Sequence, residues 1–146
     1  MKRYIETSTT QKVFRWLLAA AMLYAGISHL SINRAHFQAQ VPNWLPMDKD
    51  LVVILSGLVE IGLALALGFW KKQRVYAGWA LGIFFILIFP GNVSQYINGI
   101  DAFGVLNSDT ARLTRLFFQP VLVAWALWSA GSWTAWKTRN ELVVPQ

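Results

Sequence analysis

Residues 51–74, LVVILSGLVEIGLALALGFWKKQR, decide the fold of this chain. The first part, 51–70, is apolar except for Ser56 and the single ionisable residue Glu60. A helix of about 20 apolar residues crosses a hydrocarbon core of about 30 Å. Only KKQR separates this run from the next apolar stretch, which begins at Val75. This short link predicts a tight antiparallel hairpin of two transmembrane helices.

Two further apolar stretches complete the predicted bundle. The four predicted spans are residues about 13–30, 51–70, 75–97 and 113–133. The chain is 55% hydrophobic and 14% charged, whereas a soluble domain carries about 25% charged residues. We therefore predict an all-α membrane protein, a four-transmembrane-helix bundle in which residues 1–146 form a single membrane domain.

Lysine and arginine lie mainly on one side of this predicted bundle. The amino-terminal side, the KKQR link and the carboxyl-terminal tail hold nine of them, and the opposite side holds four. Because positively charged segments stay in the cytoplasm, both termini are predicted to be cytoplasmic. The net charge of +6 comes from short clusters between apolar stretches, which suits an anionic membrane surface and argues against nucleic acid.

Polar side chains within the predicted spans gather in the outer half of the membrane. Glu60 lies ~14 Å below the outer end of its span, at a rise of 1.5 Å per residue. Ser56 lies one turn above it. The other polar residues of this outer half are His29, Asn92, Arg115 and Gln119.

An ionisable group at the bilayer centre costs roughly 2.5–3.5 kcal/mol on insertion scales, so it normally has a partner within the protein. Arg115 is the charged side chain at a reachable depth, because its long stem can extend downward. The sequence therefore predicts a Glu60–Arg115 pair. Ser56, Asn92 and Gln119 are expected to complete its hydrogen bonds.

The third predicted span contains a helix breaker, in the stretch 87–96, LIFPGNVSQY. Pro90 cannot donate to the carbonyl of Ile86 and Gly91 permits distortion, so we predict a helix break there. Free carbonyls at membrane depth are tolerated only against protein or a water-filled cavity. With Asn92 beside it, this break predicts a small polar cavity that opens outward. The alternative is a simple kink in which Asn92 joins two helices and no ligand binds.

The first outer loop, 31–50, is too long for a simple turn. Its apolar residues Phe37, Val41, Trp44 and Leu45 predict a short amphipathic helix at the interface, followed by a rigid turn. This loop is expected to cap the cavity, with Trp44 at the mouth. A lipid-facing anchor is the alternative.

Small residues suggest where helices pack closely. Gly78 with Gly82, and Ala64 with Gly68, form stripes of the kind that let membrane helices approach one another. A faint repeat also exists, since AGISHL at 25–30 echoes SGLVEI at 56–61. Because the two spans run in opposite directions, we give this echo little weight.

Metal and thiol chemistry find little support in the sequence. The chain has no cysteine, which excludes disulfides and thiolate ligands within it. His29, His36 and Glu60 offer an alternative metal site, but their depths do not match, so no metal is predicted.

Several short motifs, in order, resemble the DoxX family of small four-helix membrane proteins. They are GISHL with a following HF, VPNWLP, SGLVEIGLALAL, FPGN and QPVLVAWALW, and the resemblance covers roughly residues 12–135. It implies a multi-pass protein of the prokaryotic cytoplasmic (inner) membrane that is associated with quinone-linked redox systems. The matching positions are His29, Pro42, Trp44, Pro46, Gly57, Glu60, Pro90, Asn92 and Gln119.

The leading functional prediction is an accessory subunit of a membrane redox system, not itself a catalyst. Its cavity would bind a quinone headgroup, another small polar molecule or an outer partner. A small transporter or proton-coupled permease is one alternative, and a structural assembly factor without ligand is another. The expected partners are the lipid bilayer, a membrane or periplasmic redox protein, and further copies of the chain. The predicted ligand-binding or functional cluster is His29, Trp44, Ser56, Glu60, Asn92, Arg115 and Gln119.

Overall fold

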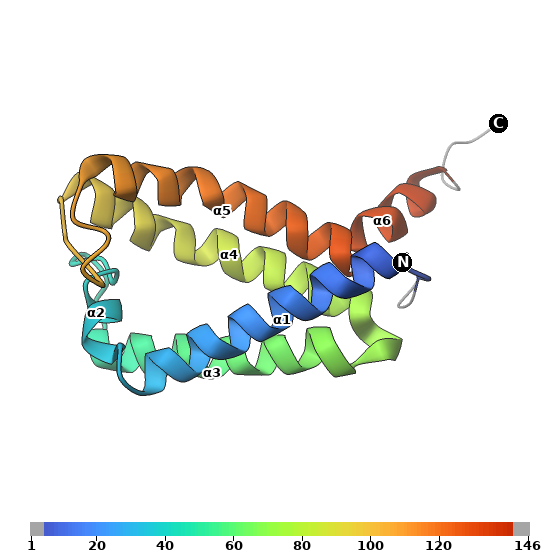
Figure 1. Ribbon diagram of the computed structural model, residues 1–146, viewed down its shortest axis with the longest axis horizontal. Helices are drawn as coiled ribbons and strands as arrows, with labels where there is room; N and C mark the ends of the chain where they lie inside the picture. Colours follow the sequence, from blue (N-terminus) through green and yellow to red (C-terminus); the bar gives the residue numbers. More distant parts are fainter. Residues whose placement is uncertain (1–4, 142–146) are drawn as a thin grey trace.

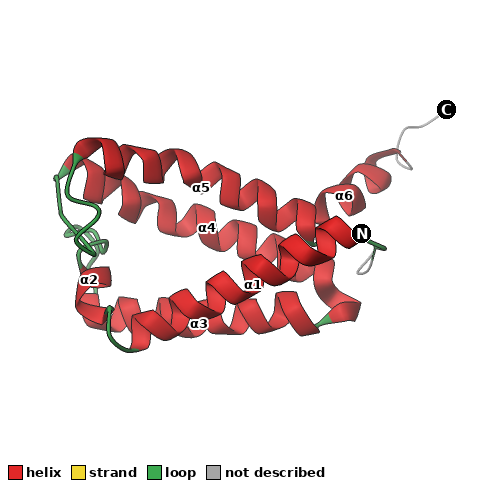
Figure 2. Cartoon of the chain, in the orientation of Figure 1, coloured by secondary structure: helices red, strands yellow, loops and turns green. Residues whose placement is uncertain are grey.

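The computed structural model describes residues 5–141, and every regular element in that range is helical (Figures 1 and 2). Lys2 and Arg3, which entered the charge count, lie outside the described residues. The four long helices are α1 (Thr9–Leu30), α3 (Lys49–Phe69), α4 (Arg74–Ile97) and α5 (Asp109–Ser129). The short elements are α2 (Arg34–Gln38), a 3-10 turn η1 (Lys71–Gln73) and α6 (Ser132–Glu141).

Three of the long helices, α1, α3 and α4, are long and apolar enough to cross a membrane on their own. α5 reaches this standard only together with α6, as a bent pair. The described chain therefore has three helices that could span a membrane, or four if the bent pair is one span.

Side-chain caps set where the long helices begin. Ser8 and Gln11 form a reciprocal capping box, so α1 starts ahead of the predicted residue 13. Asp48 accepts from the Leu51 amide at the start of α3. Each cap satisfies an N–H group that the first helical turn leaves without a partner.

The fourth predicted span, 113–133, is not one straight helix. α5 ends at Ser129, and the chain bends by 67° into α6. Gly131 adopts a φ of +76°, in the left-handed region that favours glycine. A Cβ at this position would also lie 3.2 Å from Thr7 Cγ2. Gly131 therefore ends the helix four residues before its predicted boundary at 133.

The helix break predicted at Pro90 and Gly91 is wrong. α4 continues through Pro90 from Arg74 to Ile97, because a membrane helix packed against neighbours can lose one backbone hydrogen bond without ending. Gly91 has a different role from the one expected. A Cβ on it would lie 2.6 Å from the carbonyl oxygen of Gln40, so glycine lets the segment 39–48 pack directly on α4.

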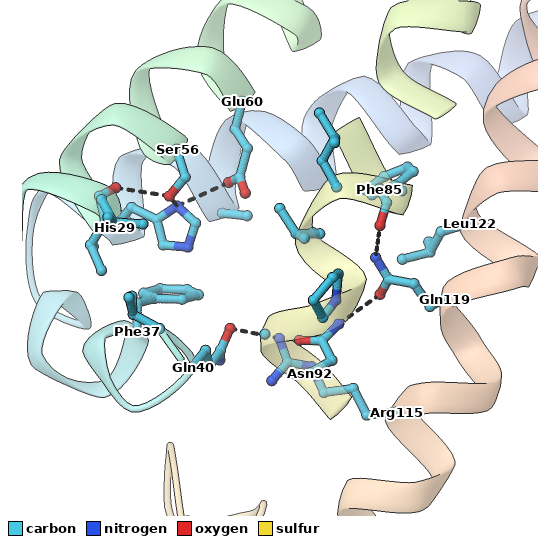
Figure 3. A pocket seen from close by; sticks show the side chains of 18 of the residues that line it. His29, Phe37, Gln40, Ser56, Glu60, Phe85, Asn92, Arg115, Gln119 and Leu122 are labelled. Atoms are coloured by element: carbon cyan, nitrogen blue, oxygen red, sulfur yellow. Dashed lines mark hydrogen bonds and ion pairs between the residues drawn. The ribbon is translucent and has the colours of Figure 1, made fainter. Parts of the chain in front are cut away.

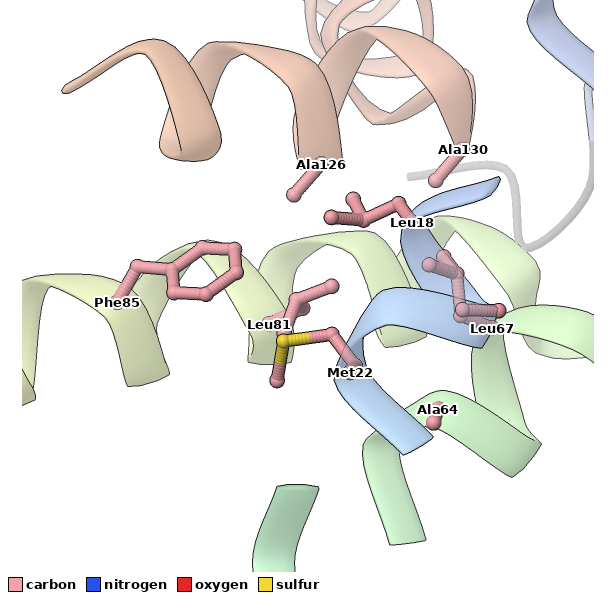
Figure 4. Packing of buried hydrophobic residues seen from close by; sticks show 9 residues of the cluster. Leu18, Met22, Ala64, Leu67, Leu81, Phe85, Ala126 and Ala130 are labelled. Carbon is pink, nitrogen blue, oxygen red and sulfur yellow. The ribbon is translucent and has the colours of Figure 1, made fainter. Parts of the chain in front are cut away.

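The four long helices form two antiparallel pairs that converge at one end and diverge at the other (Figure 1). α1 packs along α3, and α4 packs along α5, while the two pairs contact each other less. Buried apolar side chains fill the narrow end (Figure 4). They are Leu18, Ala19, Met22, Ala64, Leu67, Leu81, Phe85, Ala126 and Ala130. At the wide end, α2 and the loops lie across the space between the pairs.

Glycines allow the closest contact between helices, where α1 meets α3. A Cβ on Gly26 would lie 2.8 Å from the carbonyl oxygen of Gly57, and one on Gly57 would lie 2.7 Å from His29 Cβ. The predicted small-residue stripes also lie at packing surfaces, since Gly78 contacts Ser132 and Gly68 contacts Trp16. The small residues thus set the distance between neighbouring helices.

This packing predicts opposite effects for two Gly→Ala changes within α3. Alanine normally stabilises a helix by about 1 kcal/mol relative to glycine. At Gly57 we expect this gain to be outweighed by a clash with α1, because overpacking a tight contact costs about 1–3 kcal/mol. Gly62 has open space around it and serves as the matched control. Thermal unfolding in detergent should show a lower midpoint for Gly57→Ala and an unchanged or higher one for Gly62→Ala. A Gly57→Ala variant as stable as Gly62→Ala would contradict the close packing.

Candidate functional site

A cavity of about 480 Å³ lies between the two helix pairs at the wide end of the bundle. This volume falls within the range of about 300–1,000 Å³ that is typical of small-molecule sites. Its walls are mostly apolar, and all seven residues of the predicted cluster line it, together with Pro90 and Gly91. The structure therefore brings residues from all four long helices and from the segment 39–48 to one place (Figure 3).

One polar wall is formed by α1 and α3. The His29 ring nitrogen Nδ1 lies 3.2 Å from Glu60 Oε2, and both side chains are less than one-tenth exposed. Glu60 Oε2 accepts no aligned hydrogen bond from the described residues, so this is a contact at ion-pair distance. Ser56 Oγ lies 3.5 Å from the same ring nitrogen and donates to the Val53 carbonyl. The ring therefore lies against a carboxylate and a hydroxyl on one face of α3.

The predicted Glu60–Arg115 pair is wrong, because Arg115 lies on the other wall. Its guanidinium donates to Gln95 Oε1 and to Gln40 Oε1, both at 2.8 Å. Close approach of α1 to α3 brings His29 against Glu60, whereas α5 belongs to the opposite helix pair. Among the described residues, Glu60 has His29 and not Arg115 within ion-pair distance.

Asn92 and Gln119 also find different partners from those expected. Asn92 Nδ2 donates to Gln119 Oε1 at 2.9 Å, and Gln119 Nε2 donates to the Phe85 carbonyl at 2.8 Å. Both amides are buried. They join α4 to α5, and they do not complete the hydrogen bonds of Glu60 as predicted (Figure 3).

Aromatic rings pack together at the wide end beside this site. The rings of Phe37 and His29 are perpendicular with centroids 3.6 Å apart, and Phe103 packs on Phe37 at 4.8 Å. The Phe103 amide donates to His36 Nδ1 at 3.4 Å, and Phe103 has a φ of +58°, which is unusual for a bulky residue. Trp44 lines the cavity but remains 68% exposed.

Ion pairs hold the ends of these covering segments. Arg34 pairs with Asp50 at the start of α3, and this hydrogen bond raises the pKa of Arg34. Arg112 bonds to Asp101 at 2.6 Å and to Asp109 at 2.8 Å, which anchors the loop before α5. The aspartates of these pairs are partly or largely exposed to solvent, which screens the attraction, so the pairs position the loops more than they stabilise the fold.

The residues missed from the sequence are Gln40, Gln95 and Phe103. Gln95 belongs to the quoted stretch 87–96 and could have been placed beside Asn92. Gln40 and Phe103 carry no comparable signal, since both lie in loops. Among the described residues, no group of three or more His, Asp or Glu side chains is placed to hold a metal ion.

The site predicts energetic coupling between His29 and Glu60. Contacting residues usually show interaction energies of about 0.5–3 kcal/mol in a double-mutant cycle, whereas separated residues are additive within about 0.3–0.5 kcal/mol. We expect the first behaviour for His29→Gln with Glu60→Gln. The matched control, Arg115→Gln with Glu60→Gln, should be additive. Unfolding free energies in detergent measure both cycles, and coupling only in the Arg115 cycle would refute the observed pairing.

Comparison with known proteins gives one family match. The family model described as "Domain of unknown function (DUF8561)" matches residues 18–130, which include most of α1, the cavity and all of α3, α4 and α5. No DoxX family model was found, so the DoxX resemblance remains a prediction without support from these comparisons. No curated protein and no solved structure matches the chain. Because the match spans most of the sequence, the chain belongs to the DUF8561 family.

Proposed function

We propose that this protein is a four-span membrane protein that binds a small, largely apolar molecule by its polar head, as an accessory subunit of a quinone-linked redox system. The observation that carries this proposal is the cavity, in which His29 and Glu60 lie on one wall and Arg115 on the other. A mostly apolar pocket with a few converging polar groups is the usual form of a ligand site.

The outer surfaces of the long helices support membrane insertion. Large apolar side chains are exposed on every one of them, for example Leu17, Leu58, Leu87 and Phe117. Apolar surface of this extent favours contact with lipid. With the charge distribution of the sequence, the wide end would face outward and both termini the cytoplasm of a prokaryotic cell.

A quinone headgroup suits the chemistry of the two walls. Its flat ring is apolar, and its two carbonyl oxygens accept hydrogen bonds at opposite edges. The Arg115 guanidinium can donate to one oxygen, and His29, in contact with a carboxylate, can donate to the other when it carries the proton. The apolar tail would leave between the diverging helix pairs.

Two observations weigh against the alternatives. The apolar cluster at the narrow end closes the bundle beneath the cavity, which favours a binding site with one mouth over a transport path. A purely structural assembly factor would have no need for converging polar groups around a cavity of about 480 Å³. A redox accessory role accounts for both features.

The test is whether quinone purifies with the protein. Protein extracted from its own membranes in mild detergent should retain quinone, detected by mass spectrometry, and should bind a short-chain quinone when stripped. Ala25→Phe, which fills the cavity from α1, should abolish both properties. The matched control Ala80→Phe adds the same ring to the exposed face of α4 and should leave them unchanged. Absence of quinone from the wild-type protein, together with no binding of the short-chain quinone, would overturn the proposal.

A further inference from the structure

We infer that Arg115 and Gln40 form a site for the anionic oxygens of a single-chain organic acid whose apolar body fills the cavity. This inference goes beyond the proposed function, because a quinone is neutral and the ligand inferred here is an anion. It rests on the cavity's binding a small molecule, but it does not require that molecule to be a quinone.

The first observation is that the positive charge of Arg115 is not matched by a protein carboxylate. Its hydrogen-bond partners, Gln95 and Gln40, are neutral amides, and among the described residues no acidic group lies within ion-pair distance of it. Arg34 and Arg112, by contrast, each contact an aspartate. A half-buried guanidinium in a mostly apolar wall is stabilised by a negatively charged partner. We expect the ligand to supply this negative charge.

The second observation is an unused donor beside it. Gln40 Oε1 accepts from Arg115, which fixes the orientation of the amide group. Gln40 Nε2 is then buried without a hydrogen-bond partner among the described residues. The side chains of Arg115 and Gln40 both line the cavity (Figure 3). The unpartnered Gln40 Nε2 therefore lies beside a guanidinium whose bonded partners are both neutral amides.

The remaining walls define the rest of the ligand. On the opposite wall, Glu60 has His29 beside it, and its carboxylate would repel an anion. The anionic end of the ligand is therefore expected at the Arg115 wall. The surfaces between them are apolar, with Val53, Phe85 and Leu122 among the lining residues. A guanidinium pairs with a carboxylate in a bidentate geometry, which adds specificity for this group. The ligand that matches is therefore a carboxylate on one short apolar chain.

An acidic phospholipid could supply the same charge, but the geometry disfavours it. Gln95, which holds the Arg115 guanidinium, is only 2% exposed and lies inside the bundle. The guanidinium is thus held toward the cavity and away from the lipid surface. The cavity volume of about 480 Å³ also suits one short chain better than a two-chain lipid.

The test compares three eight-carbon probes in a neutral detergent at constant pH. Octanoate should raise the unfolding temperature of the wild-type protein, octanol should do so less, and octylammonium should not. Arg115→Gln should weaken octanoate binding by at least about tenfold, since a hydrogen bond to a charged group is lost, and should leave octanol unaffected. Arg115→Lys should recover part of the preference for octanoate. Lys72→Gln removes one exposed charge at the far end and is the matched control.

A second variant keeps the test decisive if Arg115→Gln does not fold. Gln40→Glu places a carboxylate beside Arg115, so it should raise the unfolding temperature and abolish octanoate binding. Undiminished octanoate binding in Gln40→Glu would overturn the inference. Equal effects of octanoate and octanol would also overturn it, as would stabilisation by dioctanoyl phosphatidylglycerol without any by octanoate. Octanoate binding without quinone binding would refute only the proposed function. Quinone binding without octanoate binding would refute only this inference.

Discussion

The contact between His29 and Glu60 joins α1 to α3 at the wide end of the bundle. A carboxylate near the middle of an apolar helix needs a partner, and the glycine contact between α1 and α3 places His29 where it can serve. At the wide end, the described residues of α1 and α3 then make no side-chain hydrogen bond to α4 or α5. At the narrow end, Gln11 donates to the Trp128 carbonyl and Trp125 donates to the Phe14 carbonyl. Asn92 and Gln119 satisfy each other in the same way between α4 and α5. At the wide end, each helix pair therefore satisfies most of its own polar groups.

This self-sufficiency explains why a cavity exists between the pairs. Apolar side chains join them at the narrow end, and at the wide end the walls stay apart beneath the covering segment. Arg115 links the α4–α5 pair to the segment 39–48 through Gln40, and Gly91 lets this segment pack directly on α4.

The sequence correctly predicted that the polar residues gather at one end of the bundle, but it predicted their partners poorly. Depth follows from counting along a helix, so the location of Glu60, Asn92 and Arg115 at one end of the bundle was predictable. The interaction partner of each polar side chain depends on which helices pair and on how each helix is rotated about its axis. Counting residues along a helix shows neither. The repeat of AGISHL at 25–30 and SGLVEI at 56–61 marks the positions that meet. Its two glycines, Gly26 and Gly57, lie in contact, and His29 lies against Glu60. Tertiary packing also kept α4 helical at Pro90, while Gly131 bent the chain after α5.

We propose that a bound molecule keeps the two helix pairs apart at the wide end. A crystal structure of the protein grown from a lipid mesophase, after purification without added ligand, tests it most directly. We expect diverging pairs, His29 against Glu60, and density for one small molecule whose polar head contacts Arg115. Helix pairs that close on each other along their whole length, with Arg115 bonded to Glu60 and no space between them, would contradict it.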